Sequence, residues 1–178
     1  EGNLTHYEYQ AFEAALPFAK VINALDIVDR LAVIKDEGTI NRFRKAGLMA
    51  DAGHVAVYKA IKDGGFHRYT ETEIAGIAAM GMRKEGSVWE WSFTGGNEIA
   101  SGYRTGLMGG ACTPPTERKL RAGEPLMVDL HSMFKLCLGD HTHNYLLARA
   151  TERQKWHAQN FVDLVSLCLA TYKAGVSP

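Results

Sequence analysis

The sequence is short of cysteine, of net charge and of long hydrophobic runs. Its three cysteines, Cys112, Cys137 and Cys168, are an odd number without paired spacing, which argues against a disulfide framework or a zinc knuckle. They fit a reducing compartment, so we expect a cytoplasmic protein. No apolar run reaches the roughly 18 residues that cross a bilayer. Lys plus Arg and Asp plus Glu are both 20, so neither nucleic acid nor an anionic membrane is an expected partner.

Length and composition describe one globular domain. Hydrophobic residues make up 46% and charged residues 22% of the 178 residues, which is enough for a sizeable core. The chain begins with Glu1 rather than Met, without a signal-peptide pattern, and ends abruptly after a helix-like run. We therefore expect a processed or trimmed chain, or a section of a longer gene product.

Apolar spacing and helix-ending residues predict the first part of the chain. Residues 11–35 are apolar and interrupted by Pro17, which predicts a helix followed by a short extended piece. Asp36 is a suitable N-cap for a second helix, because apolar residues then recur near helical spacing. The pair Gly64–Gly65 should end that helix.

Two capping boxes predict further helices. Thr70 with Glu73 begins one helix, which should run to Gly86, and Thr151 with Gln154 begins another. Capping boxes fix the first residue of a helix, since each satisfies two backbone N–H groups that lack helical partners.

The remaining elements are predicted as strands and a loop. Residues 88–93 have strand composition, whereas residues 99–102 should begin a loop rich in glycine and proline. Residues 125–133 and 136–149 should pair as an antiparallel hairpin. Helices combined with an antiparallel sheet indicate the α+β class, with helices packed on the sheet.

Two aspartates stand out within the predicted hairpin. If its turn is centred between Phe134 and Lys135, then Asp129 and Asp140 face each other with Cβ atoms about 4.5–5.5 Å apart. Like charges at this separation destabilise the pair. A shared proton, a basic neighbour or a metal ion should therefore compensate.

Strand alternation selects the side chains near the two aspartates. His131 shares a face with Asp129, and Thr142 shares a face with Asp140, whereas His141 and His143 lie on the face opposite Asp140. His131 is therefore a candidate metal ligand or proton carrier. The alternative is a half-buried strand histidine with a backbone partner.

Other chemically suggestive residues are expected to have structural roles. Ser101 lies beside a glycine, but no Gly-x-Ser-x-Gly pattern surrounds it, so a backbone-shaping loop is expected. Trp89 and Trp91 would alternate on a strand and line either a substrate cleft or a packed interface. The basic cluster of residues 118–121 is expected to be solvated surface.

An ordered series of segments resembles the pita-bread metallohydrolases, which include methionine aminopeptidase, prolidase, Xaa-Pro aminopeptidase and creatinase. The resemblance covers roughly residues 28–176, and Asp140 follows Asp129 at the eleven-residue spacing of that family. The segments are Arg30-Leu31, Ile34-Lys35-Asp36 through Ile40, Arg44-Lys45-Ala46, Thr70 to Ala75, Ile99 to Thr105, Arg118-Lys119-Leu120 with Gly123, and Val128-Asp129-Leu130.

The resemblance implies a fold, a metal and a reaction. Residues 28–178 would be the N-terminal half of a pita-bread catalytic domain, and residues 1–27 a preceding segment from an N-terminal domain or linker. Asp129 and Asp140 would bind divalent manganese, cobalt, iron or zinc, with three further ligands expected from the second half. The substrate loop would contribute Tyr103 and Arg104, and the substrate would be a small peptide cleaved next to proline.

Departures from the family pattern keep other functions open. Met108-Gly109-Gly110 stands where the family has a substrate-contacting Pro-His pair, and His131 replaces the usual glycine. Leu136-Cys137 and His143 also differ from the usual residues. The alternatives are a creatinase-like, metal-independent hydrolase of another C–N bond, and a non-catalytic binding or assembly half-domain that pairs as a homodimer.

Overall fold

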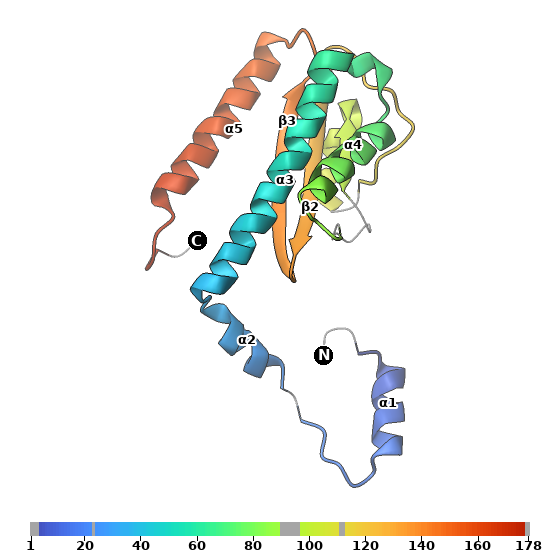
Figure 1. The fold of residues 1–178 in the computed structure, drawn as a ribbon, viewed down its shortest axis with the longest axis vertical. Coiled ribbons are helices and arrows are strands. Elements are labelled where there is room, and N and C mark those ends of the chain that lie inside the picture. The colour runs from blue at the N-terminus through green and yellow to red at the C-terminus, as the bar shows by residue number, and fades with distance from the viewer. Residues whose placement is uncertain (1–3, 23, 90–96, 111–112, 177–178) are drawn as a thin grey trace. The chain divides into compact units, whose positions relative to one another are not determined.

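A computed structural model describes residues 4–22, 24–89, 97–110 and 113–176 (Figure 1). The chain divides into two units, residues 1–40 and 41–178. Within the described ranges, no helix combines the length and the apolar character needed to cross a membrane.

The first unit contains two helices, α1 (His6–Ala15) and α2 (Leu25–Val33). α1 ends before Pro17, because the residue preceding a proline disfavours the helical conformation. The extended piece predicted within residues 11–35 is wrong, since α2 forms there. Val28, Leu31 and Ala32 recur at helical spacing, which favours a helix over a strand.

The capping residues predicted for the next two helices are confirmed. The Asp36 carboxylate accepts a hydrogen bond of 2.6 Å from the Thr39 N–H at the start of α3 (Glu37–Gly64). α4 (Glu71–Lys84) begins with the predicted capping box of Thr70 and Glu73, and it ends two residues before Gly86. η1 (Phe66–Arg68) connects the two helices.

Three antiparallel strands form one sheet in the order β1 (Glu98–Ser101), β2 (Pro125–Phe134) and β3 (Cys137–Leu146). The prediction of a loop beginning at residues 99–102 is wrong, because β1 pairs with β2 there. Of the strand predicted at residues 88–93, residues 90–93 lie outside the described ranges, and residues 88–89 form no strand. Trp89 is exposed, whereas Trp91 also lies outside those ranges.

The β2–β3 hairpin is confirmed, but its predicted register is wrong. The turn consists of Lys135 and Leu136, both with positive φ (48° and 65°), which matches the twist of a two-residue hairpin turn. The turn therefore lies one residue later than predicted. Asp129 faces Thr142 and Asp140 faces His131, so the two aspartates are diagonal neighbours.

η2 (Gly102–Gly110) follows β1, and α5 (Glu152–Thr171) follows β3. The capping box predicted for Thr151 and Gln154 is confirmed. The Gln154 side chain also donates a hydrogen bond of 2.8 Å to the Gly123 carbonyl. That bond ties the first turn of α5 to the loop before β2.

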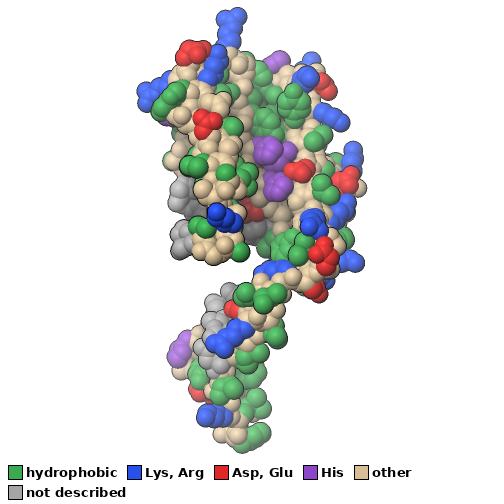
Figure 2. Space-filling model, turned by 90° about the vertical axis from the view of Figure 1, so that its left-hand side faces the viewer, with side chains coloured by type: hydrophobic (Ala, Val, Ile, Leu, Met, Phe, Trp, Pro, Cys, Tyr) green, Lys and Arg blue, Asp and Glu red, His purple; other side chains and the backbone are tan. Residues whose placement is uncertain are grey.

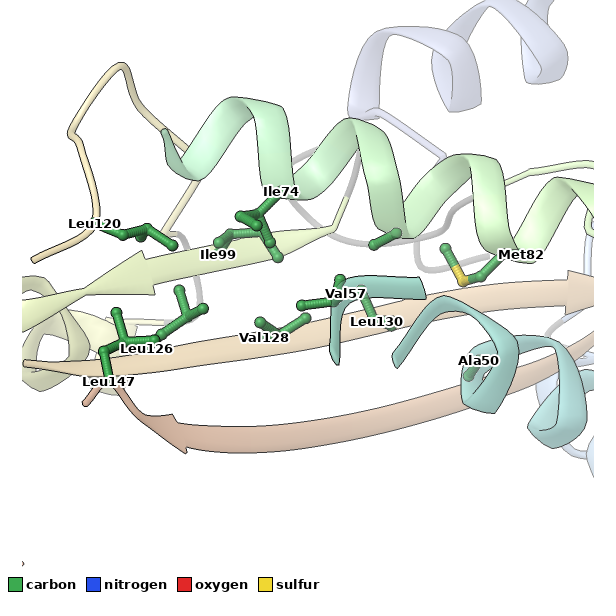
Figure 3. Packing of buried hydrophobic residues seen from close by; sticks show 11 residues of the cluster. Ala50, Val57, Ile74, Met82, Ile99, Leu120, Leu126, Val128, Leu130 and Leu147 are labelled. Carbon is green, nitrogen blue, oxygen red and sulfur yellow. The ribbon is translucent and has the colours of Figure 1, made fainter. Parts of the chain in front are cut away.

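The hydrophobic core lies between α3, α4 and one face of the sheet (Figure 3). Side chains alternate along β2, so Leu126, Val128 and Leu130 enter this core while Asp129 and His131 lie on the opposite face. The cluster also contains Ala50, Val57, Ile74, Ala78, Met82, Ile99, Leu120 and Leu147. The helices therefore leave the second face of the sheet available for polar side chains.

Two glycines allow α3 and α4 to approach closely. A Cβ on Gly81 would lie 2.9 Å from the Ala52 carbonyl oxygen and 3.1 Å from the Gly53 Cα. A Cβ on Gly53 would lie 2.7 Å from a Leu130 methyl group. Backbone atoms on the opposing helix cannot rotate away, so a side chain here would force the helices apart.

We expect Gly81→Ala to lower the free energy of unfolding by about 1–3 kcal/mol, the usual cost of overpacking a core. Gly76→Ala in the same helix is the matched control, since nothing lies within 4 Å of its added Cβ. That variant should gain roughly 0.5–1 kcal/mol from helix propensity. Urea unfolding measures the free energy of unfolding of both variants. Equal changes in the two variants would contradict the close approach of α3 and α4 at Gly81.

His54 connects α3 to β3. Its Nε2 lies 3.0 Å from the His141 carbonyl oxygen and must carry the proton, because a carbonyl only accepts. Its Nδ1 then accepts from the Tyr145 hydroxyl at 3.3 Å, and its ring stacks on His143 at 3.9 Å. Burial lowers the pKa of His54 to about 4. Figure 2 shows histidine side chains gathered on one side of the second unit.

Acidification should therefore destabilise the fold through His54. The unfolded chain takes up this proton near pH 6.5, whereas the folded chain resists it down to about pH 4. The stabilisation is complete above pH 6.5 and is lost as pH falls towards 4, by at most about 3 kcal/mol. His54→Gln should flatten this part of a stability–pH curve measured by urea unfolding. The exposed His157→Gln control should keep the parent's slope.

Candidate metal centre

The hairpin brings three of the predicted site residues together on the face opposite the core. The Nε2 atom of His131 lies 3.4 Å from an Asp129 oxygen and 3.7 Å from an Asp140 oxygen. In the described part of the chain, this is the only group of three potential ligands whose atoms all lie within 4.8 Å of one another. His131 is buried, Asp129 is largely buried and Asp140 is exposed.

Neighbouring polar groups orient this cluster. The Thr142 hydroxyl donates a hydrogen bond of 2.6 Å to Oδ1 of Asp129, which leaves Oδ2 facing His131. The side-chain oxygen of Asn97 accepts from the backbone N–H of His131 at 3.0 Å. Thr142 of β3 thus fixes the Asp129 carboxylate, and Asn97, which directly precedes β1, fixes the backbone of the strand that carries the imidazole.

Several carboxyl groups lie close together in and beside the cluster. Glu98 lies directly opposite Asp129 across β1 and β2, and burial together with the Asp129 charge raises its pKa. Burial and the same charge raise the pKa of Asp140. Burial would also raise the pKa of Asp129, but hydrogen bonds from His131 and Thr142 outweigh it and lower that pKa. Three carboxyl groups beside one imidazole favour the binding of a cation, because a cation would compensate their negative charge.

The donor geometry suits a single divalent ion. Metal bonds to carboxylate oxygen and imidazole nitrogen are about 2.1 Å long, so two ligands at a tetrahedral angle lie about 3.4 Å apart. The separations of 3.4 Å and 3.7 Å around His131 match that spacing. The residues present therefore fit such an ion.

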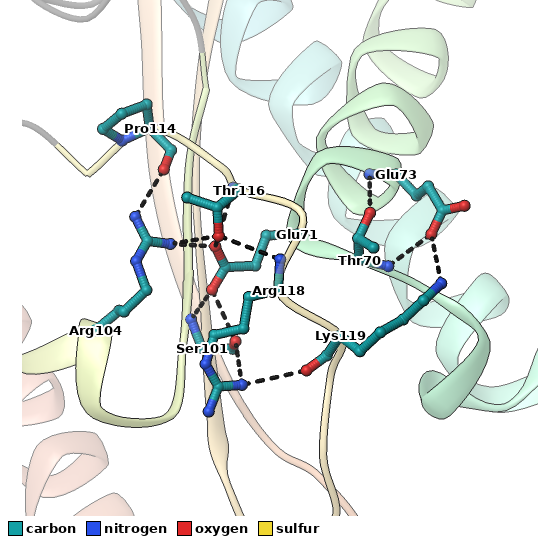
Figure 4. Close-up of polar contacts among 9 residues, drawn as sticks. All are labelled: Thr70, Glu71, Glu73, Ser101, Arg104, Pro114, Thr116, Arg118 and Lys119. Carbon is teal, nitrogen blue, oxygen red and sulfur yellow. Dashed lines mark hydrogen bonds and ion pairs between the residues drawn. The ribbon is translucent and has the colours of Figure 1, made fainter.

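Arg104 and Tyr103, the predicted substrate-loop residues, lie in η2. Figure 4 shows Arg104 beside Glu71 and Pro114. The Arg104 guanidinium donates to the Glu71 carboxylate and to the Pro114 carbonyl oxygen at 2.9 Å. Tyr103 is exposed, and the Arg118 guanidinium lies 5.6 Å from its ring centroid. In the described part of the chain, no hydrogen bond links either side chain to the Asp129–His131–Asp140 cluster.

Glu71 organises the segment around Arg104. Its fully buried carboxylate accepts two hydrogen bonds of 2.7 Å from Ser101, through the backbone N–H and the hydroxyl. Its other oxygen accepts from the N–H and hydroxyl of Thr116 at 3.1 Å and 2.7 Å. Ser101 therefore has a structural role, as predicted, although it lies on a strand rather than in a loop. Glu71 joins α4, β1 and the loop before β2.

Arg118 departs from the prediction of a solvated basic cluster. Its guanidinium is largely buried and donates to the Glu124 carboxylate at 2.8 Å and to the Ser101 hydroxyl at 3.3 Å. Sequence reasoning missed Glu71, Asn97 and Glu98 as parts of polar networks. The capping box placed Glu71 in the first turn of a helix, but its partners are 30 or more residues away.

A cavity beside the sheet lies close to the cluster. It has a volume of about 560 Å³ and lies between β3 and α5, and its wall includes Thr142, Asn144 and Phe161. Since Thr142 also binds Asp129, this cavity adjoins the cluster. A larger cavity of about 1080 Å³ lies between α3 and α4, and no residue of the cluster lines it.

Residues 41–178 match the sequence model of metallopeptidase family M24. A comparison with curated proteins gives no match.

Solved structures of related fold include the X-Pro aminopeptidase from Thermotoga maritima, with 21% identity and a TM-score of 0.80 over 98% of this chain. The Xaa-Pro dipeptidase from Bacillus anthracis has 24% identity and a TM-score of 0.81 over 98% of this chain. The prolidase from Pyrococcus horikoshii has 20% identity and a TM-score of 0.86 over 99% of this chain. The matches cover 47%, 46% and 48% of those chains, so this chain spans about half their length. At these identities the likeness establishes the fold.

The Glu71 network yields a stability prediction. Glu71→Gln should lower the free energy of unfolding by about 2–4 kcal/mol, because it leaves the largely buried Arg104 cation without its charged partner. Glu73→Gln is the matched control, since glutamine also completes a capping box and Glu73 is exposed. It should cost less than about 1 kcal/mol in the same urea experiment. Similar losses in both variants would contradict a special role for Glu71.

Proposed function

The chain belongs to metallopeptidase family M24, and we propose that it forms part of a hydrolase that cleaves a peptide bond next to proline. The predicted fold is confirmed: helices pack on an antiparallel sheet in the manner of a pita-bread half-domain, with TM-scores of 0.80–0.86 to the three peptidase structures. The functions of those three peptidases support the choice of proline-containing peptides as the substrate class.

The domain assignment is part of this proposal. Residues 28–178 would form the N-terminal half of the catalytic domain, and residues 1–27 would belong to a preceding domain or linker. The family match over residues 41–178 supports a catalytic-domain origin for the second unit.

One observation carries the proposed chemistry: Asp129, His131 and Asp140 converge with spacings that suit one divalent ion. Asp129 and Asp140 would supply oxygen donors and His131 a nitrogen donor to manganese, cobalt, iron or zinc. Such an ion supplies activation of water and polarisation of the scissile carbonyl group. Thr142 would hold Asp129 in position, and the cavity beside Thr142 offers space for a peptide.

The substrate-loop residues have separate proposed tasks. Tyr103 is exposed, so its ring is available to contact a substrate side chain. Arg104 is held by Glu71 and Pro114, so it would shape the loop that presents Tyr103.

A metal-independent C–N hydrolase of the creatinase type is the second candidate. The position of the His131 imidazole between two carboxylates favours it, because this arrangement also suits a proton carrier. Metal content and activity separate the two candidates.

A binding or assembly half-domain is the third candidate. On the described chain, the outer edge of β3 has no strand partner, and α5 exposes Trp156, Phe161 and Leu167. A second copy that covered this edge and helix would form a homodimer. Sedimentation of a stable monomer at micromolar concentration would count against such pairing.

We expect the chelator-treated chain to bind Mn²⁺ or Zn²⁺ in isothermal titration calorimetry. Asp129→Asn and Asp140→Asn should each weaken binding by roughly tenfold or more, since each removes a charged donor. Asp51→Asn is the matched control, because its exposed carboxylate binds His141 instead. Unchanged affinity in both Asp129 and Asp140 variants would remove the proposed centre.

Hydrolysis of an Ala-Pro or Leu-Pro dipeptide tests the reaction itself. Metal-dependent cleavage that Asp129→Asn abolishes is the expected result. Cleavage that persists after metal removal would select the metal-independent candidate. A chain that binds no ion and cleaves neither peptide would contradict both hydrolytic candidates for this half on its own.

A further inference from the structure

His131 distinguishes this cluster from a simple pair of carboxylates. The imidazole is buried, and its Nε2 atom lies between Asp129 and Asp140 at 3.4 Å and 3.7 Å. The three donors come from a single hairpin, and their ligand atoms all lie within 4.8 Å of one another. The cluster therefore holds three donors for one ion within a segment of twelve residues, Asp129 to Asp140.

The surroundings of His131 hold its ring in place. Its backbone N–H donates to Asn97, and His131 pairs with Asp140 in the hairpin register. The neighbouring side chains on the same face of β2, Met133 two residues later and Asp129 two residues earlier, are largely buried as well. A buried ring on a paired strand has little freedom to turn away, so its nitrogen is pre-positioned as a donor.

The chemical type of the donors determines which ion they favour. Carboxylate oxygens suit magnesium, calcium and manganese, whereas imidazole nitrogen suits zinc, copper, iron and nickel. A nitrogen donor beside two oxygen donors therefore shifts the preference away from the hard ions. The shift is measured by the ratio of two affinities, because zinc binds more tightly than manganese at most sites whatever their donors.

We propose that His131 makes this hairpin a one-ion centre that discriminates in favour of Zn²⁺ over Mn²⁺. This inference rests on the proposed function, since it requires Asp129 and Asp140 to be ligands. It narrows the choice of metal and assigns selectivity to one residue. Asp129 and Asp140 would supply the negative charge that attracts either ion, and the imidazole would supply the preference for Zn²⁺ over Mn²⁺.

The test compares dissociation constants for Zn²⁺ and Mn²⁺, measured on the full chain by competition with a chelating dye. His131→Asp keeps three charged or polar donors but makes them all oxygen. The ratio of the Mn²⁺ constant to the Zn²⁺ constant should fall by roughly tenfold or more in this variant. His131→Gln should lower the same ratio without adding a charge, which guards against misfolding caused by electrostatic repulsion.

His141→Gln is the matched control. His141 directly follows Asp140 along β3, so its side chain lies on the other face of the sheet, where its Nδ1 is 3.0 Å from an Asp51 carboxylate oxygen. Its removal should leave the ratio unchanged. A fall as large as that of the His131 variants would assign the selectivity to surface histidines and overturn the inference.

A spectroscopic readout reports the nitrogen ligand directly. The Mn²⁺-loaded chain should show electron spin-echo modulation from one coordinated ¹⁴N, at one ion per chain, and His131→Gln should lack it. If Asp129→Asn and Asp140→Asn weaken binding but the His131 variants keep both ratio and modulation, the inference fails while the proposed function stands. If the parent chain binds neither ion, both fail.

Discussion

The register in which β2 pairs with β3 is the constraint on which the candidate centre depends. The turn at Lys135 and Leu136 places His131 opposite Asp140 and Asp129 opposite Thr142. A slip of one residue would move every side chain of one strand to the other face, because side chains alternate with a period of two. The contacts among Asp129, His131 and Thr142 therefore depend on the backbone conformation of the turn at the tip of the hairpin.

The two faces of the sheet have separate tasks that support each other. α3 and α4 approach closely at Gly53 and Gly81, so their apolar side chains reach Val128 and Leu130 on one face. That core fixes the hairpin as a rigid element. The acidic residues on the other face repel one another, and a rigid support keeps them at short distances that a flexible loop would relax.

Local signals in the sequence predicted most of the elements, whereas long-range pairing decided the details of the site. The capping boxes at Thr70 and Thr151 and the N-cap at Asp36 are chemical patterns within four residues, and all three are confirmed. The turn was placed one residue early, because Lys135 and Leu136 lack the glycine or asparagine that normally marks positive φ. β1 could not be recognised, since four residues have too little periodicity and their partners lie 25 to 31 residues away. Glu98 was missed for the same reason.

The short spacing between Asp129 and Asp140 has a consequence for chain entropy. Ten residues separate the two aspartates, so an ion that joined them in the unfolded chain would close only a short loop at a small cost in chain entropy. A metal that joins distant segments is coupled to global folding, as in small zinc-dependent domains. Here the coupling would be local: an ion would favour the closed hairpin over its frayed form, and the second unit would fold around the core of α3, α4 and the sheet whether or not the ion is bound.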